Sequence, residues 1–327
     1  MLLPTLRSAA STFRHARRFL ATHAPSSSFT PAVQSIQPSQ DEITSGRLAP
    51  RNMQTALEAL HEDGIIMLQD VVNHDNLDKL NARMTADAKY LASLTDGPYN
   101  YNRGNIQQDP PPDPEMWFDD IFTNKFAIDV TTALLGGKPK MTFCSGNTAL
   151  KSAESQPVHT DSDFAHPKIP FALVVNVGLV DMKPENGSTE LWLGTQSMAQ
   201  PDAQVTTHGD RASGRIKEEL LEKRKAEAPQ KGPFQPVIPK GSIVLRDLRL
   251  WHCGKPNTTE VPRVMLAMIH FAPWYRQEGI ALRLEFPKGM EPLLSHPALD
   301  IPADFVDPPV KYLERAFGNA YDFNQRD

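Results

Sequence analysis

The chain has 327 residues, of which 40% are hydrophobic, 22% charged and 8% aromatic, and its formal net charge is −5. These values are those of a globular protein with one large domain or at most two, and the mild acidity argues against nucleic acid as a partner, which usually requires a basic surface. No apolar run approaches the roughly 20 residues that cross a bilayer, and two cysteines, Cys144 and Cys253, are too few for a disulfide framework.

The first 45 residues differ in composition from the rest of the chain. Four arginines and several serines precede the first acidic residue, Asp41. A segment rich in Arg and Ser that can form a basic amphipathic helix is typical of a mitochondrial transit peptide. A disordered tail is the alternative, because serine and proline clusters disfavour packing. We therefore expect residues 1–45 to be a targeting segment, with a mitochondrial location, or a tail on a cytoplasmic protein, and residues 46–327 to form the folded domain.

The first half of the folded part reads as helices, one buried strand and a long loop. Apolar spacing predicts a short helix from Met53 to Glu62, a strand at Ile65–Leu68 and a longer helix from about Asn76 to Leu94. Glycine, asparagine and a cluster of prolines indicate that Tyr99 to Pro114 is a loop, and a further helix is expected from Phe126 to Leu135.

From Lys140 onward the pattern changes to short strands separated by Pro, Gly and Asn turns. The strand-like segments are residues 141–144, 171–179, 190–193, 241–245 and 264–271. One charged helical insert is expected near residues 213–228. Helices followed by short antiparallel strands predict a mainly β fold with flanking helices, of the jelly-roll type or a similar closed sandwich.

The segment from Gln156 to Asp161 contains the most informative pattern. In a strand, residues i and i+2 point to the same face, so the side chains of His159 and Asp161 can reach one ion. Two histidines and one carboxylate on one face of a metal are the ligands of non-haem Fe(II) oxygenases. His252, which follows a predicted turn and strand, is the candidate third ligand, although a histidine there could also belong to the core. Asp163 is the strongest competitor, since it shares the parity of His159 and Asp161.

Arg263 begins a strand whose other inward-facing residues are apolar. Burying a guanidinium group is unfavourable without an anionic partner, and a dicarboxylate co-substrate supplies one through a bidentate contact. An ion pair with Glu260 is the alternative. His270 has the opposite parity and is expected to face away from the pocket. The residues that share the inward face of Arg263 are Met265, Ala267, Ile269 and Phe271.

At these residues the sequence resembles the phytanoyl-CoA dioxygenase family, especially its fungal members. The resemblance rests on His159-Thr160-Asp161, Glu185-Asn186-Gly187-Ser188-Thr189, Leu193-Gly194-Thr195-Gln196 and Trp251-His252-Cys253-Gly254, followed by Arg263. It implies a double-stranded β-helix in which Fe(II) is bound by a triad of side chains, namely His159, Asp161 and His252. It also implies that 2-oxoglutarate chelates the metal and that Arg263 holds its distal carboxylate.

Three further residues are candidates for the co-substrate pocket. The resemblance assigns Gln156 a contact with 2-oxoglutarate and points to Thr189 and Asn176 as lining residues. Asn176 lies among valines, and a hydrogen bond to neighbouring backbone explains a buried amide equally well. Arg246 and Arg249, which flank an aspartate, are expected to brace the loop near the third ligand rather than to bind an anion.

The resemblance also implies a reaction. With Fe(II), 2-oxoglutarate and O₂ as co-substrates, and with ascorbate as a supporting reductant, the chain is expected to hydroxylate or otherwise oxidise a C–H bond of a small organic molecule, such as a fungal secondary-metabolite intermediate. Related halogenases lack the carboxylate ligand, so Asp161 argues against halogenation. An acyl-CoA hydroxylase, a zinc hydrolase and a jelly-roll protein that binds a metal without redox activity are the alternatives. Candidate substrate contacts are residues 101–105 and 116–118.

Overall fold

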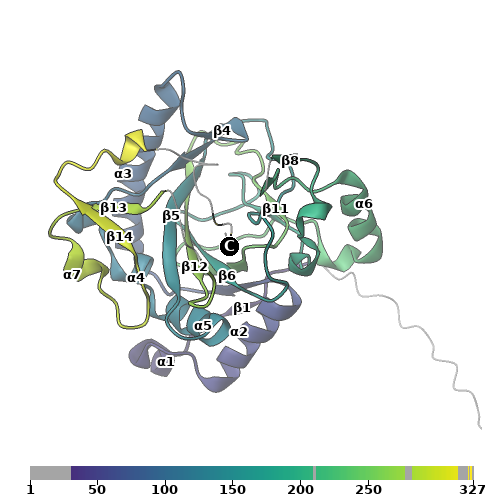
Figure 1. Ribbon diagram of the computed structural model, residues 1–327, viewed down its shortest axis with the longest axis horizontal. Coiled ribbons are helices and arrows are strands. Elements are labelled where there is room, and N and C mark those ends of the chain that lie inside the picture. Colours follow the sequence, from purple (N-terminus) through teal and green to yellow (C-terminus); the bar gives the residue numbers. More distant parts are fainter. Residues whose placement is uncertain (1–30, 209–210, 277–281, 316–322, 324, 326–327) are drawn as a thin grey trace, which may run out of the picture. The chain divides into compact units, whose positions relative to one another are not determined.

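The computed structural model describes residues 31–208, 211–276, 282–315, 323 and 325 (Figure 1). The helices are α1 (Gln40–Ser45), α2 (Pro50–Glu62), α3 (His74–Ser93), α4 (Asp119–Phe122), α5 (Lys125–Leu135), α6 (Glu218–Glu227) and α7 (Glu291–Leu294). The strands are β1 (Ser35–Ile36), β2 (Ile65–Leu68), β3 (Tyr99–Asn100), β4 (Asn102–Gln108), β5 (Lys140–Ala149), β6 (Ala172–Gly178), β7 (Glu190–Leu191), β8 (Thr207–His208), β9 (Arg211–Ala212), β10 (Ile243–Asp247), β11 (His252–Cys253), β12 (Arg263–Phe271), β13 (Leu284–Pro287) and β14 (Ala303–Val306).

The largest element of the fold is an eight-stranded sheet with the order β1-β2-β10-β6-β12-β5-β4-β3. Its neighbouring strands are antiparallel except for β1 and β2. Near its middle, β12 pairs with β5 on one side and with β6 on the other. The predicted antiparallel β-core with flanking helices is therefore confirmed. The fold is mixed α/β rather than mainly β, because helices contain at least as many of the described residues as strands do.

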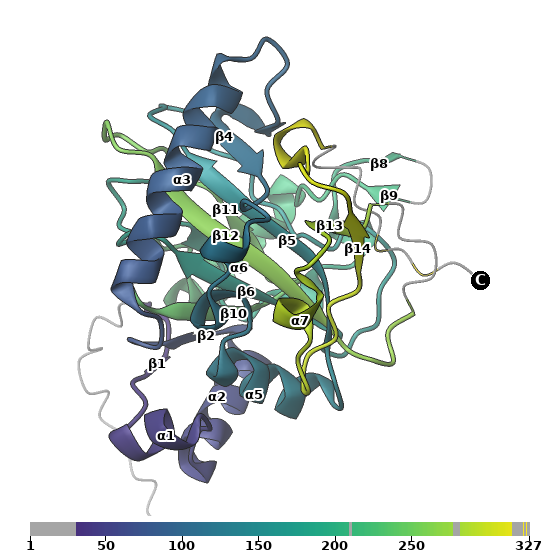
Figure 2. The ribbon, with the colours of Figure 1, turned by 90° about the vertical axis from the view of Figure 1, so that its left-hand side faces the viewer.

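The two faces of the main sheet have different partners. One face packs against α2, α3 and α5, and Figure 2 shows α3 lying across the strands. As predicted, α3 buries one apolar side, and β12 contributes every second side chain to the same core. Burial of each large apolar side chain among them stabilises the fold by roughly 1.5–3 kcal/mol. These buried residues are Leu77, Leu80, Met84, Ala88 and Leu91 of α3, with Val264, Leu266 and Met268 of β12.

A second, short layer lies opposite the other face. β7 pairs with β11, and single backbone bridges extend this layer to Phe234 on one side and through His159 to Arg215 on the other. Because the layer has no continuous strand at this point, the prediction that His159 and Asp161 share a strand is wrong. Backbone bridges, rather than strand alternation, position this segment.

The segment predicted as a loop, Tyr99 to Pro114, contains a hairpin at the edge of the main sheet. β3 and β4 join across Tyr101, and β4 pairs with β5 from Asn105 to Gln108. Polar residues have a low strand propensity, but the edge of β5 offers unpaired backbone groups that β4 completes. The buried amide of Gln108 is satisfied, because it donates a 2.9 Å hydrogen bond to the carbonyl oxygen of Met84.

The folded part of the chain also begins earlier than residue 46. β1 pairs in parallel with β2, and α1 follows it. Ser39 and Glu42 form a capping box, in which each side chain accepts a hydrogen bond from the backbone of the other. The boundary predicted at residue 45 therefore lies too late in the chain. The targeting prediction falls mainly on residues 1–30, which lie outside the described residues.

Glu42 ties α1 to the start of α2. Its carboxylate accepts hydrogen bonds from the backbone N–H groups of Ser39 and Ala49, both at 2.7 Å, and from the Asn52 side chain at 2.8 Å. Burial disfavours the charged form, but these hydrogen bonds outweigh burial and lower the pKa of Glu42 to about 2.

We expect the variant Glu42→Gln to have a free energy of unfolding about 1–3 kcal/mol below that of the wild type at neutral pH. The reason is that the N–H groups that donate to Glu42 in the folded state lose a charged acceptor. The folded pKa lies below the ordinary value of 4.5, so the stabilisation is complete above that value and is lost as the pH falls toward about 2. The difference in Tm should therefore narrow below about pH 4.5. Glu58→Gln, on the exposed side of α2, is the control, and a difference that is constant with pH contradicts the expectation.

The charged helical insert predicted near residues 213–228 is present as α6, but it starts later. Residues before it are extended, because Arg215 bridges to His159 and the backbone of Ile216 donates to Val158. Among the described residues, no helix combines the length and the apolar character of a membrane span. Both cysteines are buried and free.

Candidate metal centre

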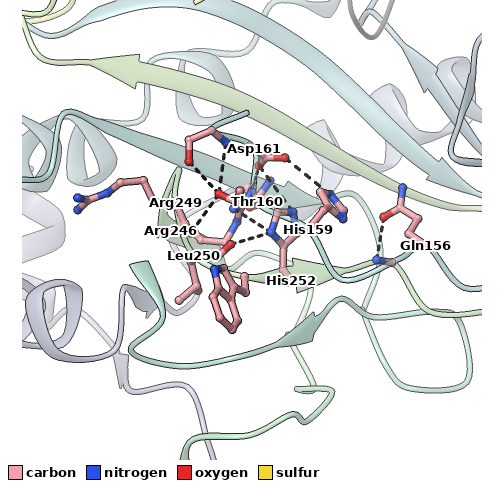
Figure 3. Close-up of polar contacts among 12 residues, drawn as sticks. Gln156, His159, Thr160, Asp161, Arg246, Arg249, Leu250 and His252 are labelled. Atoms are coloured by element: carbon pink, nitrogen blue, oxygen red, sulfur yellow. Dashed lines mark hydrogen bonds and ion pairs between the residues drawn. The ribbon is translucent and has the colours of Figure 1, made fainter. Parts of the chain in front are cut away.

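Three side chains singled out in the sequence converge in a cavity between the two layers (Figure 3). The nitrogen and oxygen atoms that His159, Asp161 and His252 can offer to a metal lie within 4.8 Å of one another. His159 Nε2 is 3.8 Å from Asp161 Oδ1, and His252 Nε2 is 3.6 Å from Asp161 Oδ2. Within the described ranges, no other group of His, Cys, Asp and Glu side chains is arranged in this way.

A reciprocal pair of backbone hydrogen bonds holds the two histidines together. The N–H of His159 donates to the carbonyl of His252, and the N–H of His252 donates to the carbonyl of His159, both at 2.9 Å. This is the hydrogen-bonded pair of an antiparallel ladder, which places the two side chains next to each other on one face. The hydroxyl of Thr160 donates to the carbonyl of Arg249 at 3.1 Å and holds the intervening residue (Figure 3).

The ring orientation of both histidines is set by the backbone two residues earlier. His159 Nδ1 lies 2.9 Å from the carbonyl oxygen of Pro157, and His252 Nδ1 lies 2.9 Å from that of Leu250. A carbonyl oxygen only accepts, so each Nδ1 carries the proton. The lone pair of each Nε2 is then directed at the cluster, which is the tautomer that a metal requires.

The protonation states also suit a metal. Burial lowers the pKa of His159 and, together with the charge of Arg246, lowers that of His252 well below its usual range. Burial opposes ionisation of Asp161, but His252, Arg246 and His159 outweigh it and lower the pKa of the carboxyl. At neutral pH the site therefore offers two neutral imidazoles and one carboxylate, the forms that bind a divalent ion. This donor set fits Fe(II) with positions left open for co-substrates.

Arg246, on β10, contacts this cluster directly. Its Nη2 donates to Asp161 Oδ2 at 2.6 Å, and its Nη1 lies 3.3 Å from His252 Nδ1 (Figure 3). The prediction that Arg246 only braces a loop is therefore wrong. The alternation of β10 could have indicated its place, since Arg246 and Val244 share one side of the strand, opposite Ile243 and Leu245 in the main core.

Arg249 has the bracing role that was predicted. Its Nε and Nη2 donate to the two oxygens of Asp247 at 2.8 and 2.7 Å, and its Nη1 donates to the carbonyl of Lys168 at 2.7 Å. Both members of this pair are almost fully buried. The pair fixes the turn that leads from β10 to His252.

The two arginines should respond differently to replacement by methionine. Arg246→Met removes an outer partner of the carboxylate and is expected to weaken Fe(II) binding by about 10–100-fold. Arg249→Met leaves Asp247 buried without its counterion and is expected to lower the free energy of unfolding by about 3–5 kcal/mol. Anaerobic Fe(II) titration and urea denaturation of both variants measure the two effects. Wild-type Fe(II) affinity in Arg246→Met contradicts the contact described above.

Arg263 reaches the same cavity from the first residue of β12. It is 1% exposed, its Nη2 donates to the carbonyl of Gly187 at 2.9 Å, and its Nε has no hydrogen-bond partner. The alternative partner Glu260 pairs with Lys151 instead. Among the described residues no carboxylate forms an ion pair with Arg263, and burial lowers its pKa to about 10, so it stays charged at neutral pH. A buried cation facing a cavity without a counterion suits an anionic ligand.

The other predicted pocket residues line this cavity as well. Gln156 accepts a 2.8 Å hydrogen bond from the N–H of Gly254, and Asn176 donates to the carbonyl of Leu266 at 3.2 Å. Asn176 therefore makes the backbone hydrogen bond that was considered for it, and it also lines the cavity. Thr189 lies on the same wall. A contact of these three side chains with a co-substrate stays a prediction.

The cavity has a volume of about 230 Å³, and its wall away from the triad is mostly neutral. Of the candidate substrate contacts, Tyr101 lines it, whereas Trp117 stacks on Phe122 in the main core at a ring distance of 4.5 Å. Phe323 also lines it, and nothing in the sequence pattern pointed to a residue so near the C-terminus. The remaining wall is formed by Gln107, Phe143, Ser145, Asn147, Val174, Met265, Ala267 and Ile269.

Three other residues that the sequence analysis considered for the site have the following positions in the structure. Asp163 lines the cavity but does not belong to the metal-ligand cluster. His270 faces the helices, as expected, with its Nδ1 3.1 Å from the hydroxyl of Thr131 on α5. Phe271 was expected on the inward face with Ile269; it does not line the cavity, but it is buried next to it, in ring contact with the cavity residue Phe323 at 5.1 Å.

Comparison with known proteins agrees with this geometry. Residues 60–265 match the phytanoyl-CoA dioxygenase family. The dioxygenase af480 of Aspergillus fumigatus is 29% identical over 236 residues, which are 69% of each chain. Among solved structures, EctD from S. alaskensis matches in its apoform, with a TM-score of 0.51, 21% identity and coverage of 74% of this chain and 81% of EctD. Its form with 2-oxoglutarate and 5-hydroxyectoine gives a TM-score of 0.52, 20% identity and coverage of 76% and 84%.

The family match spans most of the folded chain and includes the His-x-Asp segment, the third histidine and Arg263. At this level of identity, the likeness to EctD establishes the fold. The match and the triad geometry agree on one chemistry. The chain belongs to the phytanoyl-CoA dioxygenase family and is a 2-oxoglutarate-dependent non-haem iron dioxygenase.

Proposed function

We propose that this enzyme hydroxylates a C–H bond of a small, mainly apolar organic molecule, with Fe(II) held by His159, Asp161 and His252 and with 2-oxoglutarate held by Arg263. The observation that carries this proposal is the position of Arg263. It is a buried cation without a carboxylate partner among the described residues, and it shares a cavity with a cluster of three metal-binding side chains. Terminal carboxylates pair with guanidinium groups in this way.

We also infer that the two layers form a double-stranded β-helix. Support comes from the cavity between the layers, which takes its lining from both, and from the likeness of the fold to EctD. EctD has been solved with 2-oxoglutarate and 5-hydroxyectoine bound, which supports a 2-oxo acid and a hydroxylated product in the present cavity.

When bound, the iron supplies open coordination positions at which oxidative decarboxylation of 2-oxoglutarate is coupled to oxidation of a C–H bond. The protein orients the side chains that would bind the metal. The carbonyls of Pro157 and Leu250 hold the two imidazoles, and Arg246 engages one oxygen of Asp161 so that the other is available to the metal. Arg263, at the first residue of β12, would hold the distal carboxylate of the co-substrate.

The cavity favours an uncharged substrate over an acyl-CoA. Its substrate-facing wall combines apolar side chains such as Phe143 and Ile269 with neutral polar ones such as Ser145 and Asn147. At about 230 Å³ it is smaller than the roughly 300–1,000 Å³ typical of ligand pockets, so a coenzyme A moiety would have to lie outside it, in a wider groove of about 1,060 Å³ whose lining includes three carboxylates and two arginines. The similarity to a dioxygenase of Aspergillus fumigatus supports a fungal metabolite as the substrate.

A screen of candidate substrates tests this proposal. The chelate of Fe(II) and a 2-oxo acid absorbs visible light, so anaerobic protein with both can be mixed with O₂ and the decay of the absorption followed. We expect uncharged, mainly apolar metabolites to accelerate the decay and CoA thioesters to have no effect. Acceleration by CoA thioesters and by no uncharged molecule contradicts the proposed substrate class. Absence of any O₂-dependent succinate contradicts the enzyme function itself and favours a metal-binding protein without redox activity.

A further inference from the structure

Tyr101 holds an unusual backbone conformation at the tip of the hairpin between β3 and β4. Its φ of 67° lies in the left-handed region, which large side chains rarely adopt. The turn is held by its neighbours: the carbonyl of Asn100 accepts a hydrogen bond from Gln156 at 3.4 Å, and the side chain of Asn102 accepts one from the N–H of Gly104 at 2.9 Å. Strain of this kind is kept where the position of a side chain matters to function.

The ring of Tyr101 lies against the metal centre. Its centroid is 4.8 Å from that of the His159 imidazole, at an interplanar angle of 44°. On another side the guanidinium of Arg215 is 5.6 Å from the ring centroid. Gly214 lets the phenol approach, since a Cβ at this glycine would lie 3.3 Å from the Tyr101 oxygen. The ring is therefore fixed between a predicted iron ligand and a cation.

Tyr101 also marks the way into the cavity. A larger outer groove, of about 1,060 Å³, shares four lining residues with the inner cavity, namely Asn100, Tyr101, Asp163 and Ser213. Two other tyrosines, Tyr90 and Tyr99, line the outer groove only. Tyr101 thus stands at the junction, with its ring beside the position that the reacting part of a substrate must take.

We propose that Tyr101 is a site of oxidative self-modification: when 2-oxoglutarate is turned over with no substrate in the cavity, its ring is hydroxylated to 3,4-dihydroxyphenylalanine. This inference rests on the proposed function. The O–O bond of O₂ and the bond between C1 and C2 of 2-oxoglutarate break, and one oxygen atom completes the new carboxylate of succinate as CO₂ leaves. The other forms a C–O bond to the ring, and the displaced ring hydrogen becomes the proton of the new hydroxyl. O₂ gains four electrons, two from 2-oxoglutarate and two from the ring.

Other oxidisable side chains of the inner cavity are poorer targets for this hydroxylation. Phe143 and Phe323 pack edge to face at a ring distance of 6.1 Å, and their rings are less electron-rich than a phenol. Met265 lines the cavity from β12 and is the strongest alternative target. Among the aromatic side chains in the described part of the chain, Tyr101 is the one in ring contact with a triad histidine.

The test needs no knowledge of the substrate. Full-length protein is incubated with Fe(II), 2-oxoglutarate and O₂, then digested with trypsin and examined by mass spectrometry. Cleavage after Lys89 and Arg103 places Tyr90, Tyr99 and Tyr101 on one peptide, so two tyrosines of the outer groove serve as internal controls. We expect this peptide to gain one oxygen atom, confined to Tyr101, in proportion to the succinate formed. When the reaction is run with heavy-isotope O₂, the oxygen atom added to Tyr101 should carry the isotope.

Two variants sharpen the result. Tyr99→Phe, the matched control in the same hairpin, should still gain the oxygen at Tyr101, and Asp161→Ala should lose both succinate and the modification. Succinate formed without oxygen on Tyr101, or with oxygen mainly on Met265, overturns this inference while the proposed function stands. Oxidation of Tyr101 in Asp161→Ala at the wild-type level also overturns it, because the oxidant then arises in solution. If no succinate forms in the wild type, the proposed function fails first.

Discussion

Replacement of one triad residue is expected to abolish the reaction. In Asp161→Ala and His252→Ala, Fe(II) affinity and succinate formation should each fall by more than about 100-fold, which exceeds the 10–100-fold effect of losing an outer-shell partner. The reason is that each variant loses one of the three metal ligands, and Asp161→Ala also loses the negative charge of the triad. Without Asp161 the site keeps two neutral imidazoles beside the cation Arg246, and without His252 it keeps only two ligands. Iron retained after anaerobic loading and desalting, together with succinate, measures both effects.

Two further variants separate loss of the metal from loss of the fold. Asp161→Asn keeps the shape of the side chain beside Arg246 while removing its charge, so it should fold and still fail to retain iron. His166→Gln is the matched control, because His166 lies outside the cavity and its ring nitrogens contact the carbonyls of Pro167 and Ala199. Full coupled turnover in either Asp161 variant contradicts the ligand assignment.

The second large effect is expected at Arg263. Removal of one partner of a buried, hydrogen-bonded charge pair costs about 2–5 kcal/mol of binding, which corresponds to a KM for 2-oxoglutarate raised by about 30-fold to several thousand-fold in Arg263→Met. Without 2-oxoglutarate, the same substitution should not lower the stability of the folded protein. Because Arg263 is then buried without a carboxylate partner among the described residues, Arg263→Met should have an equal or higher Tm.

Succinate formation at varied 2-oxoglutarate concentrations gives the KM, and thermal unfolding with and without 2-oxoglutarate gives the stability. Binding of 2-oxoglutarate to the folded state should raise the Tm of the Fe(II)-loaded wild type and leave that of Arg263→Met nearly unchanged. Arg283→Met removes an arginine that pairs with Asp304 at 2.9 Å on the surface, and it should alter neither KM nor the response. A wild-type KM in Arg263→Met would show that the distal carboxylate binds elsewhere.

Elements with strong periodicity could be predicted from the sequence. The apolar spacing of α3 identified Leu77, Leu80 and Met84 as core residues, and all three are fully buried. The alternation along β12 placed Arg263 and His270 on opposite faces, as the structure has them. These patterns succeed because burial on one side selects apolar residues at a fixed period.

Elements that depend on their neighbours could not be predicted. The hairpin at Tyr99–Gln108 is polar, and it is a strand pair only because β5 offers an edge. The second layer is built from single bridges, so the convergence of His159 with His252 depends on backbone pairing between distant segments rather than on local alternation. Phe323 reaches the cavity from the end of the chain, where no local pattern indicates a role.

The central claim is that the cavity around His159, Asp161 and His252 uses Fe(II) and O₂ to turn over 2-oxoglutarate. The most direct measurement is succinate formation by purified protein loaded with Fe(II), compared under air and under argon, and compared with protein loaded with Zn(II). We predict succinate only with Fe(II) and O₂ together, and none from Asp161→Ala. Succinate that is independent of O₂, equal with Zn(II), or undiminished in Asp161→Ala would contradict the assignment of this site.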